Sequence, residues 1–454
     1  MRNKKLVAIL TTAFLSTALI AFSAQTKADP LSFPAVWNEI NVSSPAQEAS
    51  RLQVESLTES QTRASHHWLP KIYLDARAYQ SNDSGDNFFG LLEQRSLQPS
   101  DFNPATINYP GANIFERGAI GLDLPLFEGG MRSSQNEMLK HSVSAQQSST
   151  SQVQIEQYSQ VGISYASIGI LTQEQARLEE LKSEIEHLKK NYKLGNKSNP
   201  VGYSGLLGIE SVANRLNGLL NQYEAETRAH FGLLREMGLK QTKWQPTLRD
   251  SRRFVDHFFI KSSEASAPLS YKSQALRENV AAGEEAVHME KAKFLPRVGA
   301  FAETYVFNGS RNEAAGYNAG IYLRWNLFDP ADYGSLGEAK LKALSAKKYS
   351  EAMEQQERAE KVALTENING LNKNIALLDD SYKLLVEQSK MAVTLFQNGA
   401  INALQIVEIL NRRADLISQQ CEAELGLVKT AAQAVTKESF DISQHLLDGV
   451  KNEK

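Results

Sequence analysis

The sequence predicts a mainly α-helical protein with a small β portion, arranged as two tandem structural repeats. Three observations predict this fold. The motif Trp-Leu-Pro-Lys-Ile at 68–72 returns as Phe-Leu-Pro-Arg-Val at 294–298. No proline lies within 126–199 or 331–454, which leaves room for two long helices. Runs in which apolar and polar residues alternate follow each Leu-Pro motif and predict short strands.

The first residues have the pattern of an export signal. Basic residues among the first five precede an apolar stretch at 6–22, and small residues before Asp29 are suited to cleavage. We interpret residues 1–28 as a signal peptide, with an uncleaved membrane anchor as the alternative. The mature chain is therefore expected in the periplasm or the outer membrane.

Charge and cysteine content exclude some classes of protein. The formal net charge is −3, and residues 1–28 carry four cations and no acid, so their removal leaves −7. This acidic balance does not suggest a nucleic-acid partner, and none is predicted. The single cysteine, Cys421, excludes an intrachain disulfide.

Each proline-free interval predicts a helical hairpin. The first long helix is expected from about Gly130 to Tyr192 and the second from about Asp332 to Phe396, or roughly 95 Å each at about 1.5 Å per residue. Each then reverses at a tip glycine, Gly195 in the first hairpin and Gly399 in the second. The return helices are expected at 204–238 and 402–439.

Apolar spacing favours coiled-coil packing between these helices. Both long helices carry a seam with alternating steps of three and four residues, in the same register relative to the tip glycines. The first seam comprises Leu178, Leu181, Ile185, Leu188 and Tyr192. The second comprises Leu371, Ile375, Leu378, Tyr382, Leu385, Ser389, Ala392 and Phe396.

A strand pair is expected in each repeat, between the Leu-Pro motif and the long helix. The alternation is that of an outer-membrane strand with one face to lipid and one to water, although a half-exposed sheet on a soluble domain has the same pattern. After residue 28 no apolar run reaches the roughly 18–20 residues of a membrane-spanning helix, so any crossing falls to strands. The apolar positions are Ile72, Leu74, Ala76, Ala78, Ile120, Leu122, Leu124, Leu126, Ala319, Ile321, Leu323, Trp325 and Leu327.

Four strands cannot close a barrel by themselves, because the smallest outer-membrane barrels use about eight. The chain is therefore expected to share its strands with other copies, and three copies supply twelve. The connection between the first two strands, residues 81–113, is the longer of the two and is rich in Asn, Asp, Gly, Ser and Pro. It is predicted to be a long loop on the outside of the cell.

These residues resemble the TolC-like family of outer-membrane efflux and secretion channels, the outer membrane factors. The resemblance rests on the duplicated Leu-Pro entry to a strand, on the strand exits Leu-Phe-Glu-Gly-Gly at 126–130 and Leu-Phe-Asp-Pro at 327–330, and on the two tip glycines. It covers nearly the whole mature chain. It implies a homotrimer with a twelve-stranded barrel in outer-membrane lipid and a coiled-coil tunnel of twelve helices in the periplasm.

The resemblance also implies a division of the chain. The parts are the signal peptide (1–28), a first repeat (29–239), an inter-repeat equatorial segment (240–268), a second repeat (269–448) and a C-terminal tail (449–454). Each repeat is expected to hold a helix, a strand pair and a long helical hairpin. The equatorial segment is placed at the waist of the tunnel by the resemblance alone.

The function implied is that of a passive exit duct in a tripartite efflux pump or a type I secretion system. Its partners would be a periplasmic adaptor protein and an inner-membrane pump or ABC transporter. Small molecules and an unfolded polypeptide both remain open as the substrate. The alternative is a structural or adhesive coiled-coil protein of the periplasm or cell surface, which would share the helices but need no two-faced strands.

No catalytic, cofactor or metal site is predicted, so we do not expect an enzyme. The eight histidines are scattered, and the adjacent pair His66 and His67 points to different helix faces. The sequence has no phosphate-binding glycine loop after a strand and no serine or cysteine nucleophile motif.

The function is expected to concentrate at the periplasmic tip of the hairpins, which must close at rest and open on docking. Two acidic residues occupy equivalent positions after the two turns, so three chains would bring six carboxylates toward one axis. The resembling family commonly carries aspartates at the two second-repeat positions that are glutamine and glutamate here. The candidate gate residues are Glu210, Glu408, Gln405, Phe396 and Tyr192.

Overall fold

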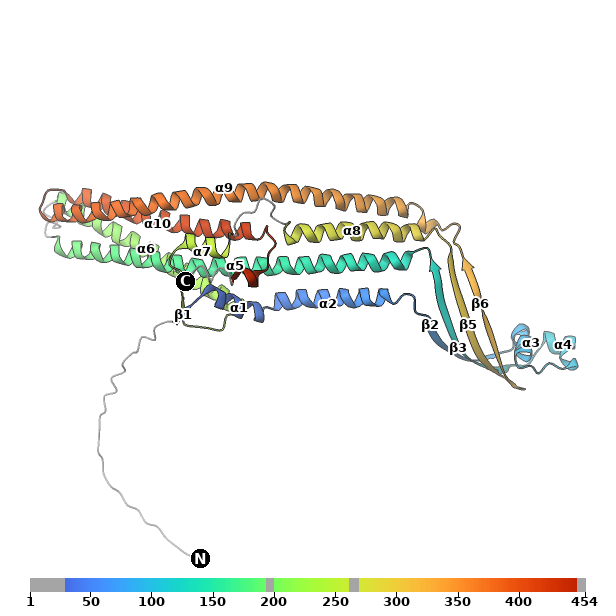
Figure 1. Cartoon of the computed structure of the whole chain (residues 1–454). Coiled ribbons are helices and arrows are strands. Elements are labelled where there is room, and N and C mark those ends of the chain that lie inside the picture. The colour runs from blue at the N-terminus through green and yellow to red at the C-terminus, as the bar shows by residue number, and fades with distance from the viewer. Residues whose placement is uncertain (1–28, 193–199, 261–268, 447–454) are drawn as a thin grey trace, which may run out of the picture.

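The computed structural model describes residues 29–192, 200–260 and 269–446. Its long helices run side by side along one shaft, and four strands form a curved sheet at one end (Figure 1). The tips of the helical hairpins lie at the opposite end. No helix in these three ranges is long and apolar enough to cross a membrane.

The elements follow one another in the order in which Figure 1 colours them. The helices are α1 (Phe33–Ser43), α2 (Pro45–Ser65), α3 (Ser84–Glu93), α4 (Pro104–Asn108), α5 (Met131–Asn191), α6 (Pro200–Glu236), α7 (Ser251–Phe258), α8 (Tyr271–Ala292), α9 (Ser335–Gln397) and α10 (Ala403–Val435). The strands are β1 (Asp29–Leu31), β2 (Lys71–Ser81), β3 (Asn113–Glu128), β4 (Trp244–Pro246), β5 (Arg297–Asn308) and β6 (Glu313–Arg324). Two 3-10 turns lie at Pro99–Phe102 and Pro330–Asp332.

Helices α5 and α9 confirm the two long helices predicted from the proline-free intervals. They span 61 and 63 residues, and each begins after a glycine with positive φ, 83° at Gly130 and 80° at Gly334. Such a φ suits glycine, which lets the chain turn sharply from the sheet into the shaft. Gly399 has a φ of 73° just beyond α9, as expected of a glycine that ends a helix. The turn predicted at Gly195 lies outside the described residues.

The coiled-coil seam of α5 is largely buried, and that of α9 is buried or half-buried. In α5, Leu178, Leu181 and Ile185 are fully buried. In α9, Ser389 is fully buried and Ile375 nearly so. The steps of three and four residues keep these side chains on one face of each helix. In the half nearer the hairpin tip, this face packs against the neighbouring helices.

Aromatic side chains fill the core at the middle of the shaft. Phe33 of α1 contacts the rings of Tyr158 and Tyr165 from α5 and of Phe254 and Phe258 from α7. Strand β1 pairs with β4 in parallel, which ties the start of the described chain to the segment between the two hairpins. Residues 240–260 therefore pack beside the shaft at its middle, next to α5 and α10.

The sheet has the strand order β2-β3-β5-β6, and every neighbouring pair is antiparallel. The two predicted strand pairs thus lie side by side, with β2 and β6 as the edge strands. The last strand is shorter than expected, because β6 ends at Arg324 and the predicted positions Trp325 and Leu327 follow it. Pro330, which begins the next turn, lies only a few residues further on.

The connection from 82 to 112 differs from the loop that its composition predicts, because it contains two short helices. Asp83 caps α3 by accepting hydrogen bonds from the backbone of Gly85 and Asp86, and Asn103 caps α4 by accepting from Ala105. Asp and Asn serve turns and helix N-caps equally well, so composition alone does not separate the two.

Candidate functional site at the helical tips and the strand sheet

One face of the sheet is apolar and exposed. Its residues come from alternate positions of the strands, as the sequence predicts. Ile72 and Leu74 of β2 are 74% and 75% exposed, and Ile321 and Leu323 of β6 are 77% and 67% exposed. Side chains this apolar are rarely left in water as a continuous surface, so the face needs an apolar environment.

The other face of the sheet is polar and carries a network of charges. The hydroxyl of Tyr73 in β2 donates to the carboxylate of Glu303 in β5 at 2.9 Å. Arg117 of β3 lies between two acids, forming ion pairs with Glu303 and, at 3.7 Å, with Asp75. A sheet with one apolar and one charged face suits a boundary between lipid and water.

The two hairpins meet at the tip of the shaft through an aromatic pair. The rings of Tyr192 and Phe396 stack with centroids 5.5 Å apart, and the Tyr192 hydroxyl donates to the backbone carbonyl of Gly202 at 3.0 Å. The structure therefore brings together two of the five predicted gate residues, one from each repeat.

Small residues let the return helices approach closely just behind this pair. A Cβ on Gly205 of α6 would lie 2.2 Å from the Cβ of Ala403 in α10 and 2.9 Å from the Tyr192 hydroxyl. One turn further on, a Cβ on Gly208 would lie 3.1 Å from Val407. Sequence reasoning did not single out these glycines, although their spacing on one helix face is visible in the sequence.

Both predicted gate glutamates have basic partners. Glu210 forms an ion pair with Lys189 of α5 at 2.9 Å, and Glu408 forms one with Arg412 on the next turn of its own helix at 2.9 Å. Gln405 acts as a structural cap, because its side chain accepts a hydrogen bond from the backbone N–H of Asn402, and the Asn402 side chain accepts one in return. Within one chain, each of the two carboxylates is therefore paired with a basic side chain.

Further ion pairs tie the hairpins together above the tip. The guanidinium of Arg413 in α10 is almost fully buried and binds Glu184 of α5. Arg215 of α6 pairs with Asp415 of α10. These pairs were not predicted, because their partners lie on different helices and far apart in the sequence.

A cluster of acids lies deeper in the shaft, where α5, α9 and α10 meet. Glu174 is only 1% exposed, and its burial raises the pKa of that carboxyl to about 7, opposed by the Arg177 guanidinium at 2.9 Å. Burial also raises the pKa of Glu424 in α10. Asp379 of α9 accepts hydrogen bonds at 3.0 Å from Arg252 of α7 and at 2.6 Å from a glutamine of α10.

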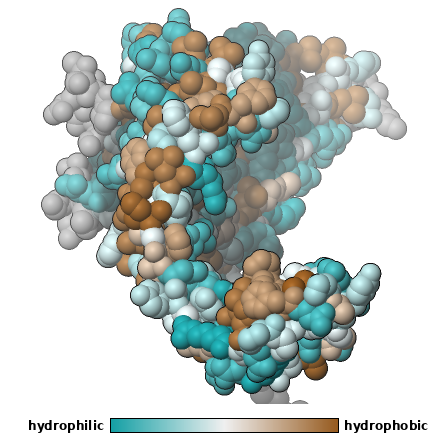
Figure 2. Space-filling view, turned by 90° about the vertical axis from the view of Figure 1, so that its right-hand side faces the viewer, coloured by the Kyte–Doolittle hydropathy of each residue, from teal (hydrophilic) through white to brown (hydrophobic). Residues whose placement is uncertain are grey.

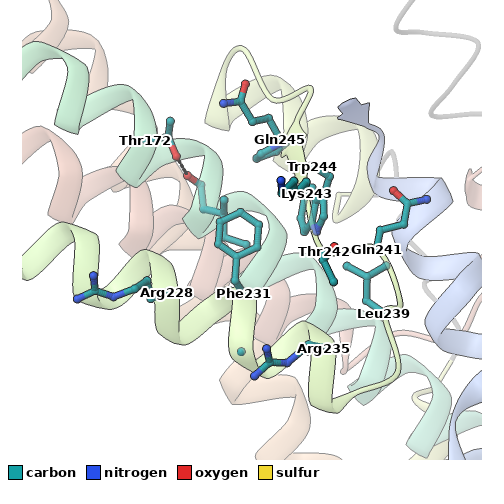
Figure 3. A pocket seen from close by; sticks show the side chains of 13 residues that line it. Thr172, Arg228, Phe231, Arg235, Leu239, Gln241, Thr242, Lys243, Trp244 and Gln245 are labelled. Carbon is teal, nitrogen blue, oxygen red and sulfur yellow. Dashed lines mark hydrogen bonds between the residues drawn. The ribbon is translucent and has the colours of Figure 1, made fainter. Parts of the chain in front are cut away.

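A surface pocket of about 710 Å³ lies between α6 and the segment that follows it (Figure 3). Phe231 and Trp244 meet edge to face at 5.1 Å among its lining residues, which also include Arg235 and Lys243. Its 13 lining residues include no Asp, Glu, His or Cys, the side chains that most often bind metal ions. Elsewhere in the described ranges no cluster of three such residues has the geometry of a metal site.

Comparison with solved structures gives matches along almost the whole chain. The CmeC outer-membrane channel of Campylobacter jejuni matches with a TM-score of 0.73 at 11% identity, over 99% of this chain and 98% of that chain. CusC, described as a transmembrane channel, matches with a TM-score of 0.74 at 12% identity, over 90% and 92%. The MtrE outer-membrane channel of Neisseria gonorrhoeae, solved in its open state, matches with a TM-score of 0.70 at 12% identity, over 89% and 88%.

The chain has the fold of the TolC-like outer-membrane channels. No protein-family model matches the sequence, and no curated protein matches it. The likeness to these three channels is therefore one of structure, with identities of 11% or 12%. In this fold the two-faced sheet and the helical tips are opposite ends of one shaft, as Figure 1 shows.

Proposed function

We propose that the protein is the outer-membrane exit duct of an export system, assembled from three copies. Each copy would contribute its four strands to a barrel of twelve in outer-membrane lipid and its helices to a periplasmic tunnel. Residues 1–28 would serve as the export signal that takes the chain across the inner membrane. The duct would be passive, with no chemistry of its own.

The observation that carries this proposal is the sheet, which has two unlike faces and two open edges. β2 and β6 are long edge strands of 11 and 12 residues, and their outer backbone groups lack strand partners within the described chain. In lipid such edges are untenable, since unpaired backbone groups cost several kcal/mol each. Pairing β6 of one copy with β2 of the next closes the ring and leaves no edge.

The unequal lengths of the connections between the strands support one orientation of the duct. The helical shaft would lie in the periplasm and the 82–112 connection outside the cell, because outer-membrane barrels join short periplasmic turns with longer external loops. The alternative, a structural or adhesive coiled-coil protein, is less well supported. Such a protein would not require a sheet with one apolar and one charged face.

The gate would lie at the hairpin tips, where Tyr192 and Phe396 stack, with Gln405, Glu210 and Glu408 on the first turns of the return helices. Opening requires the two hairpins to separate, and the aromatic stack joins them at that point. A periplasmic adaptor would dock on the tips and connect them to an inner-membrane pump or an ABC transporter. The support for these partners is the likeness to outer-membrane channels.

The test is a disulfide scan of the expected seam between copies. A cysteine replaces Ala76 in β2, and a second cysteine is moved along residues 315–321 of β6, in a Cys421→Ala background. Mild oxidation of whole membranes should give a species of three chains at one register. The matched control replaces Gly118 of the central strand β3 instead of Ala76 and should give none. A protein that stays monomeric in the outer-membrane fraction, with no cross-link at any register, contradicts the proposal.

A further inference from the structure

The connection between β2 and β3 packs against the end of the sheet that is remote from the shaft, on the side of its polar face. Asn87 and Gly90 of α3 are buried, and so is Gln94, which directly follows the helix. A Cβ on Gly90 would lie 2.5 Å from the ring of Phe115. Phe115 is an odd-numbered residue of β3 and therefore shares its face with Arg117, on the charged side of the sheet. We call residues 82–112 the cap.

The cap is fastened to the turn between β5 and β6. Gln94, which is fully buried, accepts hydrogen bonds from the backbone N–H groups of Arg311 at 2.9 Å and Asn312 at 3.1 Å. The guanidinium of Arg311 also donates to both carboxylate oxygens of Asp101, at 2.7 and 2.6 Å. These hydrogen bonds from Arg311 hold the pKa of Asp101 below its usual value. Paired charge-assisted bonds of this kind fix orientation as well as position.

The side of the cap that faces away from the sheet is aromatic. Phe89, Phe102 and Tyr109 are 63%, 56% and 86% exposed, and Leu92 is 43% exposed. The ring of Phe88 lies next to those of Phe89 and Phe102, at centroid distances of 5.8 Å and 6.0 Å respectively. In the view onto this end of the molecule, hydrophobic residues gather on the cap (Figure 2). We call Phe89, Leu92, Phe102 and Tyr109 the cap patch.

The position of the cap patch decides what can cover it. The lipid-compatible surface of the sheet is the opposite face, which carries Ile72 and Ile321. The cap lies on the charged face, which in a closed ring points to the axis. An apolar surface there meets either water or the same surface on another copy, and the hydrophobic effect favours burial against another copy.

We propose that the cap patch is a contact surface between copies of this chain, through which three caps meet over the outer mouth of the duct and narrow it. The inference rests on the proposed trimer and adds a second constriction, at the end opposite to the tips. The occupant of the patch is a second copy of the chain. A constriction made by caps that are fastened to their own sheets would persist when the tips open.

Cross-linking tests the contact directly. Phe89→Cys and Tyr109→Cys are made singly in the Cys421→Ala background and treated with a short bismaleimide on intact cells. Each should give a cross-linked pair of chains. The control, Val306→Cys, places a cysteine near the same end of the sheet but on its apolar face, and should give none. Trimers that form without any cross-link through the cap overturn this inference and leave the proposed function intact, whereas the absence of trimers overturns the proposed function.

Conductance tests the consequence. Phe89→Ser combined with Phe102→Ser removes apolar area from the patch, and Arg311→Ala removes the paired hydrogen bonds to Asp101, which weakens the fastening to the turn without touching the patch. Both variants should raise the single-channel conductance in planar bilayers and admit larger solutes from the outside. Glu93→Gln, which changes an exposed residue at the end of α3, should behave as the wild type. Unchanged conductance in both variants, with trimers present, contradicts a constriction by the caps.

Discussion

The rings of Tyr192 and Phe396 stack at 5.5 Å with an angle of 25° between their planes, although the two residues belong to different helical hairpins. Tyr192 follows the end of α5, and Phe396 precedes the end of α9. The stack therefore joins the last residues of the two long helices. Any movement that separates the hairpins at their tips must break it.

We expect Phe396→Ala to loosen the closed tip. Aromatic pairs contribute roughly 0.5–1.5 kcal/mol beyond the area that they bury, and this stack is lost in the variant. The leak conductance of the undocked channel in planar bilayers should rise. Tyr192→Phe is the matched comparison, because it keeps the ring and removes only the hydroxyl that donates to Gly202. Its leak should be smaller than that of Phe396→Ala, and equal leaks would assign the closure to the hydroxyl.

The close approach of α6 and α10 predicts an effect for a single methyl group. Gly205→Ala places a Cβ where 2.2 Å separates it from Ala403, so the helices must move apart. Overpacking of this kind typically costs about 1–3 kcal/mol. We expect a lower unfolding temperature and a higher leak through the tip.

The control for Gly205→Ala is Gly218→Ala on the same helix. No atom lies within 4 Å of the added Cβ at Gly218. Alanine is favoured over glycine in a helix by about 0.5–1 kcal/mol, so this variant should be slightly more stable than the wild type. If Gly205→Ala also stabilised the protein, the close contact at the tip would be unimportant.

The ion pairs at the tip predict opposite effects for acids and their partners. Glu408→Gln combined with Glu210→Gln should lower the cation preference of the channel and its block by multivalent cations. Lys189→Gln combined with Arg412→Gln frees the same two carboxylates and should raise both. Exposed pairs of this kind contribute about 0–1 kcal/mol, so trimers should form in all variants. Equal cation selectivity in the two double variants would show that these glutamates do not contribute to the gate.

The sequence was most informative where one periodicity runs over a long distance. The absence of proline and the seam with steps of three and four residues predicted that the first long helix ends at Tyr192. In the structure α5 ends one residue earlier, at Asn191. Strict alternation likewise assigns Ile72 and Tyr73 to opposite faces of the sheet. In both cases a local rule decides the structure, because the same environment repeats at every turn or every second residue.

Contacts between distant segments were beyond this reasoning. The folded cap depends on hydrogen bonds between Gln94 and the backbone of Arg311 and Asn312, more than two hundred residues away. At the tip, the Arg412 partner of Glu408 is visible from a spacing of four residues on one helix. The partner of Glu210, Lys189, lies on another helix, so this ion pair cannot be inferred from the sequence.

The buried carboxyl of Glu174 predicts a dependence of stability on pH. Burial raises its pKa from 4.5 to about 7, so between these values the folded chain holds a proton that the unfolded chain has released. Stability from this group is therefore complete below about pH 4.5 and is lost as the pH rises through 7. With about 1.4 kcal/mol for each pKa unit, the loss by pH 8 is at most about 3.5 kcal/mol per chain.

Glu174→Gln tests this dependence, because the amide stays neutral at every pH. Relative to the wild type, the variant should gain unfolding temperature at pH 8 compared with pH 5, as measured by calorimetry or by circular dichroism. Loss of the 2.9 Å ion pair with Arg177 lowers the stability of the variant when Glu174 is ionised, so the difference between the two pH values is the informative quantity. Glu179→Gln removes an exposed carboxylate from the same helix and serves as the control. If both variants follow the wild type in parallel from pH 5 to pH 8, Glu174 is ionised throughout that range, and the Arg177 guanidinium rather than burial sets its charge.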